Sequence, residues 1–181
     1  MYISREDRNR TNSKNVAMTP VSATLLGDLY EKLDLNLSDK LSQKGKVALC
    51  GEISSCTDSI IDWLAEQKSK LVVFQRETVA MGWLTDYAEE LDLMLVDADC
   101  MPDLGEAVDF CLQIRRAVPD LKIILISSKV REPDLSCERM VACDATLKWP
   151  VTVKYLSLGF RAARENHGSF MASRKAALGV C

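Results

Sequence analysis

The stretch that decides the fold is LDLMLVDADCMPDLG, residues 91–105. Its first seven positions are mostly apolar and lack the regular polar–apolar alternation of a half-exposed strand. A strand of this composition is buried on both of its faces, which requires helices on both sides of the sheet. The run ends at Asp97, and Asp99 follows two residues later. The stretch therefore predicts a covered strand of a parallel sheet over 91–97, with acidic side chains at its carboxyl end.

Short apolar runs of the same kind alternate with amphipathic helical segments from Lys46 onward. Four further strands are predicted, over 46–50, 70–75, 121–127 and 144–148. Helices are predicted over 55–67, 77–90, 105–117, 133–141 and 151–164. This alternation is typical of βα units. We expect an α/β fold with a doubly wound five-stranded parallel sheet and right-handed crossovers.

The segments on either side of this unit differ from it in composition. Residues 1–18 are polar and basic, which predicts a mobile tail. A helical extension and linker is predicted over 19–45, because Thr19 and Pro20 are typical of a helix start and a leucine stripe follows. The stripe, an interface candidate that we expect to pack on the domain or on a second copy of the chain, consists of Leu25, Leu29 and Leu33. The α/β domain is predicted to cover 46–165, and 166–181 a C-terminal tail.

The composition excludes several classes of protein. The net charge of −3 gives no overall attraction to nucleic acid. Seven cysteines without a Cys-x-x-Cys pair indicate reduced thiols and a cytoplasmic location. His167 is the only histidine, which excludes zinc sites built on several imidazoles and nucleophiles activated by a histidine within the fold. No apolar run approaches the roughly 20 residues that span a bilayer, so we expect no membrane segment.

The residues that follow the predicted strands carry a coherent chemistry. Ligands of such sheets bind beyond the carboxyl ends of the strands. The side chains predicted at that edge are Glu52, Asp97, Asp99, Ser127, Ser128 and Lys148. Carboxylates can hold Mg²⁺ or attack phosphorus, a hydroxyl can hydrogen-bond a phosphoryl group, and an ammonium group can neutralise it. The edge is therefore a candidate site for phosphoryl chemistry.

Four stretches resemble the receiver domains of bacterial response regulators over roughly 46–165. They are KVALCGE (46–52), LDLMLVDADCMPDLG (91–105), PDLKIILISS (119–128) and VACDATLKWPV (141–151). The resemblance implies a flavodoxin-like receiver fold. It further implies that Asp97 is the phosphoacceptor, that Glu52 and Asp97 hold Mg²⁺, and that Ser127 and Lys148 contact the phosphoryl group.

The sequence also departs from the receiver pattern. Gly51 stands at the first acidic position, and one extra residue separates Asp97 from Pro102, so that Asp99 competes as ligand or acceptor. Trp149 lies between Lys148 and Pro150, where the family has Lys-Pro, and we interpret it as a packing or interface residue. Because Trp149 precedes the proline, its peptide bond can be the cis one. Ala145 stands where the family has its switch aromatic.

These departures favour a degenerate receiver, a signalling module that acts through protein–protein interaction. The first alternative is a phosphorylation-competent receiver that accepts phosphate from a histidine kinase on Asp97 with Mg²⁺. A second is part of a transcription regulator, and the partners expected are a kinase or another signalling protein, or a second copy. Nucleic-acid contact is disfavoured because no helix-turn-helix is visible, and an enzymatic role because there is no Gly-rich phosphate loop or nucleophile elbow.

Overall fold

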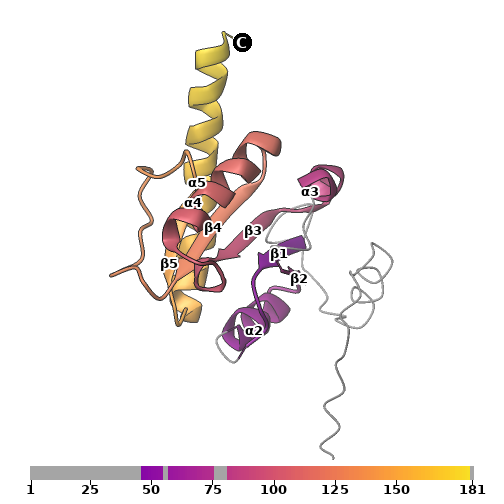
Figure 1. Cartoon of the computed structure of the whole chain (residues 1–181), viewed down its shortest axis with the longest axis vertical. Coiled ribbons are helices and arrows are strands. Elements are labelled where there is room, and N and C mark those ends of the chain that lie inside the picture. The colour runs from indigo at the N-terminus through magenta and orange to yellow at the C-terminus, as the bar shows by residue number, and fades with distance from the viewer. Residues whose placement is uncertain (1–45, 55–56, 76–80, 180–181) are drawn as a thin grey trace, which may run out of the picture.

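The computed structural model describes residues 46–54, 57–75 and 81–179, and it confirms the doubly wound α/β fold (Figure 1). Five parallel strands form one sheet in the order β2-β1-β3-β4-β5. They are β1 (Lys46–Cys50), β2 (Lys70–Phe74), β3 (Leu93–Asp97), β4 (Lys122–Ser127) and β5 (Ala145–Lys148). The covered strand predicted from 91–97 lies in the middle of the sheet, and its carboxyl end faces the same edge as the ends of the other four strands.

Helices cover both faces of the sheet. They are α2 (Asp58–Glu66), α3 (Met81–Tyr87), α4 (Leu104–Ala117) and α5 (Val153–Leu178), with short 3₁₀ helices η2 (Ala88–Glu90) and η3 (Ala98–Cys100). On one face, α2 and α5 pack on the sheet, and the rings of Trp63 and Phe160 meet edge to face at 4.8 Å. Phe110 and Ile114 of α4 and Leu84 of α3 pack on the other face. Helix α5 approaches β5 so closely that a Cβ on Gly159 would lie 2.9 Å from a Leu147 methyl group.

The helix predicted over 133–141 is wrong. The segment between β4 and β5 forms turns, and Asp134 pairs with Thr146 of β5 in an antiparallel bridge. The Asp134 carboxylate accepts hydrogen bonds from the amide and hydroxyl of Ser136 at 3.0 and 2.7 Å. The Asn166 side-chain amide donates to the carbonyls of Leu135, Ser136 and Asp144. The backbone groups that a helix would use internally therefore bond to β5 and α5 instead.

Helix α5 is longer than the helix predicted over 151–164. It begins after Thr152, whose hydroxyl accepts a hydrogen bond from the Tyr155 amide, and it ends at Gly179, which has a φ of 65°. Residues 166–178, predicted as a tail, continue the helix, whose last turns project beyond the rest of the molecule (Figure 1). None of the described helices, α5 included, is long and apolar enough to cross a membrane.

A buried ionic network holds the middle of α5 to the body. Arg115 of α4 is 5% exposed and Asp144 is 0% exposed. Their closest charged atoms, Nη2 and Oδ2, are 2.8 Å apart, and Oδ2 also accepts from the Ile123 amide at 2.7 Å. Arg115 Nη1 lies 3.0 Å from His167 Nδ1, and the guanidinium stacks 4.7 Å from the Phe170 ring centre. Hydrophobic periodicity could not predict this network, because it assigns apolar residues and not charged ones to the core.

The predicted N-terminal segments, 1–18 and 19–45, lie outside the described residues. The interface role of Leu25, Leu29 and Leu33 therefore stays a prediction.

Candidate functional site

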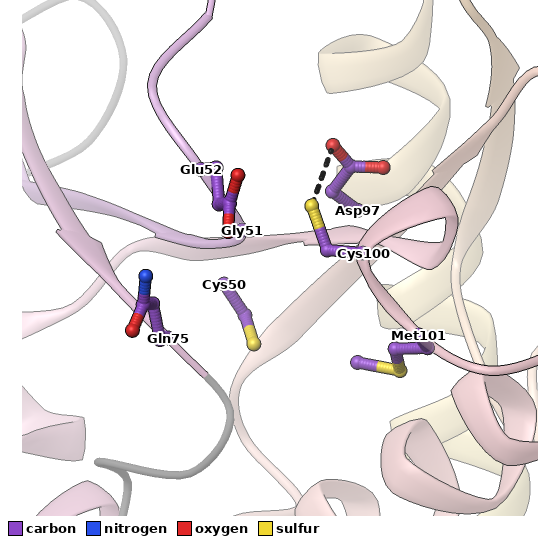
Figure 2. Close-up of a pocket in the computed structure, with 7 residues that line it drawn as sticks. All are labelled: Cys50, Gly51, Glu52, Gln75, Asp97, Cys100 and Met101. Atoms are coloured by element: carbon purple, nitrogen blue, oxygen red, sulfur yellow. Dashed lines mark hydrogen bonds between the residues drawn. The ribbon is translucent and has the colours of Figure 1, made fainter.

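A pocket opens at the carboxyl edge of the sheet, between the ends of β1, β2 and β3 (Figure 2). Its volume is about 120 Å³, and its lining residues are Cys50, Gly51, Glu52, Gln75, Asp97, Cys100 and Met101. Two of the predicted site residues, Glu52 and Asp97, thus share one pocket. Ser127, Lys148 and Trp149 do not line it, although they lie at the ends of the neighbouring strands.

Asp97 is a buried carboxylate, 7% exposed, with hydrogen bonds to both of its oxygens. Oδ1 accepts from the Asp99 amide at 2.9 Å and from the Trp149 indole Nε1 at 3.0 Å. Oδ2 accepts from the Cys100 thiol at 3.5 Å, as Figure 2 shows. All three donors are uncharged groups of this chain. Among the described residues, the hydrogen bonds to this carboxylate thus come from neutral dipoles and not from the cation that phosphoryl chemistry needs.

The residue at the end of β5 that bonds to Asp97 is Trp149, which directly follows the strand, and not Lys148, its last residue. Neighbouring residues of an extended chain point to opposite faces, so only one of the two can face the site. Lys148 is exposed, and its ammonium group donates to the Arg131 carbonyl at 3.0 Å. Trp149 is 7% exposed and precedes a cis peptide bond to Pro150. The contact of Lys148 with a phosphoryl group stays a prediction, which the bond to Arg131 does not favour. The burial of Trp149 favours packing over an exposed interface.

Ser127 bonds to Asp99 and not to Asp97. Its hydroxyl, which is 0% exposed, donates to Asp99 Oδ1 at 2.9 Å, and the Ser128 amide donates to Asp99 Oδ2 at 2.9 Å. Burial raises the pKa of the Asp99 carboxyl, but hydrogen bonds from Ser128 and Ser127 and the nearby charge of Lys129 outweigh it, so the pKa is below its usual value. Asp99 therefore carries its negative charge at the end of β4.

Position 51 requires glycine because its backbone lies very close to Asp97. A Cβ built on Gly51 would lie 2.8 Å from the Cβ of Asp97, closer than two carbons approach without displacement. The Asp97 Cβ sits on the backbone of the central strand and cannot turn away as the tip of a flexible side chain can. The missing acid at position 51 is therefore also a steric requirement of this site.

Cys100 adds a thiol to the same pocket. Burial and the negative charge of Asp97 raise the pKa of this thiol to about 11. Its proton stays in place at neutral pH and is available for the hydrogen bond to Asp97. Cys100 was not among the predicted site residues, although its place between Asp99 and Met101, just after β3, could have indicated it.

We expect Cys100 to react slowly with iodoacetamide, because the thiolate is the reactive form. A pKa of about 11 against an ordinary value of 9.0 makes the thiolate about 100-fold rarer at pH 8. The rate should rise with pH until about pH 11 and should increase in Asp97→Asn, which removes the negative charge. Peptide mass spectrometry of timed alkylation measures both effects, with the exposed Cys137 as internal reference. Equal rates for Cys100 and Cys137 at pH 8 would contradict this assignment.

The residues at the pocket do not fit a Mg²⁺ ion as they stand. Mg²⁺ needs oxygen ligands with free lone pairs in a near-octahedral arrangement. Oδ1 of Asp97 already accepts two hydrogen bonds, the protonated thiol of Cys100 lies against Oδ2, and Gly51 supplies no carboxylate. Among the described residues, no group of three or more His, Cys, Asp and Glu side chains is arranged to hold a metal ion. The predicted ligand set of Glu52 and Asp97 is thus brought together but incomplete.

Comparison with known proteins gives a structural match alone. No protein-family model matches the chain, and neither does any curated protein. The beryllofluoride-activated NtrC4 receiver domain, solved as a dimer in solution, superposes with a TM-score of 0.52 at 19% identity, over 68% of this chain and 98% of that one. A response-regulator receiver domain protein from Clostridium thermocellum gives a TM-score of 0.51 at 19% identity, over 70% and 98%. With its strand order and its helices on both faces, this chain has the fold of a response-regulator receiver domain.

Proposed function

We propose that this chain is a signalling module of the receiver fold that works through protein–protein contacts and does not use phosphorylation of Asp97. The observation that carries the proposal is the hydrogen bond from the Trp149 indole to Asp97 Oδ1, with the Lys148 ammonium group on the Arg131 carbonyl. An aspartyl phosphate adds negative charge to a site that is already acidic. A neutral indole stands where a cation would have to neutralise that charge.

Two further features support the proposal. The Ser127 hydroxyl is already bonded to Asp99, and the Lys129 amide donates to its oxygen at 3.1 Å, so the hydroxyl is committed within the chain. Gly51 also adds no carboxylate to the pair of Glu52 and Asp97 that lines the pocket, because position 51 has no room for a side chain. The Ser127 hydroxyl and the Lys148 ammonium group are therefore engaged elsewhere, and position 51 adds no metal ligand.

The proposed partners are proteins. The NtrC4 domain that this chain resembles was solved as a dimer, which makes a second copy of this chain one candidate and another signalling protein the other. We place the protein in the cytoplasm, because the described cysteines, Cys50, Cys100, Cys111, Cys137 and Cys143, are all free thiols. We assign no catalytic activity to the module.

Incubation with acetyl phosphate and Mg²⁺, followed by intact-mass measurement, tests the proposal. We expect the wild-type chain to gain no phosphoryl group, as for Asp97→Asn, while a phosphorylation-competent receiver domain treated in parallel is labelled. Labelling of the wild type that Asp97→Asn abolishes would overturn the proposal. It would favour the alternative of a receiver that accepts phosphate on Asp97, for which the shared pocket of Glu52 and Asp97 is the supporting observation.

A further inference from the structure

The end of β4 presents two donors to one carboxylate. The Ser127 hydroxyl and the Ser128 amide come from consecutive residues, and each donates to a different oxygen of Asp99 at 2.9 Å. The positive charge of Lys129 lies near the same carboxylate. A hydroxyl, an amide and a nearby cation are the groups that bind a small oxyanion in proteins. The end of β4 is therefore an anion position, and a side chain of this chain fills it.

We propose that the Asp99 carboxylate permanently occupies this anion position. It thereby keeps the carboxyl edge of the sheet in the arrangement of an anion-bound site without phosphorylation. The inference rests on the proposed function and deepens it, since it concerns how the same edge is regulated. The carboxyl edge then has a single conformation, fixed by Asp99, instead of two conformations whose balance a kinase changes.

The loop after β3 is built to hold Asp99 in this position. Asp97 Oδ1 accepts a hydrogen bond from the Asp99 amide, which closes the turn of η3. The Asp99 side chain then bonds to the end of β4. The indole of Trp149, the residue that follows β5, bonds to the same Asp97 Oδ1. The ends of β3, β4 and β5 are thus joined through two carboxylates, with Asp97 linking β3 to β5 and Asp99 linking β3 to β4.

The Asp99 carboxylate also disfavours the binding of a second anion at Asp97. An oxyanion bound at Asp97 would need the Ser127 hydroxyl that Asp99 already holds, and it would face the Asp99 charge across the same loop. Removal of the Asp99 carboxylate should therefore do two things. It should free the hydroxyl and the amide, and it should leave a space shaped for a small carboxylate.

Chemical rescue of Asp99→Ala tests the proposal. Hydrogen exchange of the Ser128 amide should accelerate about tenfold or more in the variant, because a charge-assisted hydrogen bond is lost. Sodium formate, which replaces the missing carboxylate, should restore most of the protection, with sodium chloride at equal ionic strength as control. The wild type should not respond to formate, because its position is filled. Absence of rescue by formate, or an equal response of the wild type, would overturn the proposal.

A second variant keeps the test decisive if Asp99→Ala does not fold. Asp99→Asn has nearly the same shape but carries no charge, and its amide fills the space. We expect faster exchange at Ser128 that formate does not restore. Wild-type protection in Asp99→Asn would overturn the occupant role, because the charge would then be unnecessary. Labelling of wild-type Asp97 by acetyl phosphate would instead count against the proposed function, so the two failures are distinguishable.

Discussion

Replacing Arg115 with leucine is expected to lower the free energy of unfolding by about 3–5 kcal/mol. The guanidinium is buried and pairs at 2.8 Å with Asp144, a carboxylate with 0% exposure whose other oxygen lies 3.4 Å from His167 Nδ1. Without Arg115 the carboxylate stays buried without the one neighbour that is permanently charged, a much larger cost than the loss of a surface pair. The same change removes the group that His167 and Phe170 contact, so exchange of the α5 amides after residue 167 should also accelerate.

Arg116 provides the matched control. It is the next residue of α4, it is exposed, and it too is a basic residue in the last turn of the helix. Arg116→Leu therefore removes the same charge and the same interaction with the helix dipole, and we expect a change within about 0.5 kcal/mol. Urea denaturation of the two variants gives the comparison. A loss below about 1 kcal/mol for Arg115→Leu would contradict the role of the buried pair.

Restoring an acid at position 51 is expected to damage the site and not to repair it. Gly51→Asp places a Cβ 2.8 Å from the Asp97 Cβ and adds a carboxylate beside Asp97 and Glu52. Overpacking of this kind costs about 1–3 kcal/mol, and the added negative charge increases the cost. We expect a lower melting temperature and no stabilisation by added Mg²⁺. Thermal denaturation with and without Mg²⁺ measures both.

Gly51→Ala and Gly82→Asp separate the two causes. Gly51→Ala has the steric conflict without the charge and should lose most of the stability that Gly51→Asp loses. Gly82 lies in α3, and a Cβ built on it meets no described atom of another element within 4 Å, so Gly82→Asp adds a charge without a conflict and should have little effect. A gain in melting temperature for Gly51→Asp in Mg²⁺ would show that the close approach relaxes and that a metal site forms.

The fold could be predicted because its strands are decided by burial. Leu93, Met94, Leu95 and Val96 have no polar alternation, and a strand of this kind must lie under helices on both faces. The segment before β5 was predicted wrongly because its conformation depends on distant partners. Thr146 and Asn166 bind its backbone, and hydrophobic periodicity does not register such hydrogen bonds.

The candidate site was predicted in outline and not in its contacts. Glu52 and Asp97 were expected at one edge and do line one pocket, because parallel strands bring their carboxyl ends together. Lys148 was chosen by residue type, yet direction along an extended chain is decided by position, and the position that faces Asp97 belongs to Trp149. Aligning the residue directly before Pro150, instead of the lysine, with the receiver pattern would have indicated Trp149. Asp99 was noted as a competitor, but its bonds to Ser127 and Ser128 required coordinates.

The antiparallel bridge between Asp134 and Thr146 has a consequence for solubility. β5 is the last strand of the sheet, and an uncovered last strand offers its backbone groups to other molecules as a template for aggregation. In this chain the Thr146 amide and carbonyl are both bonded to Asp134, and Asn166 fixes the covering segment from α5. The irregular segment around Asp134 therefore hinders the addition of a strand from another molecule at the β5 edge of the sheet.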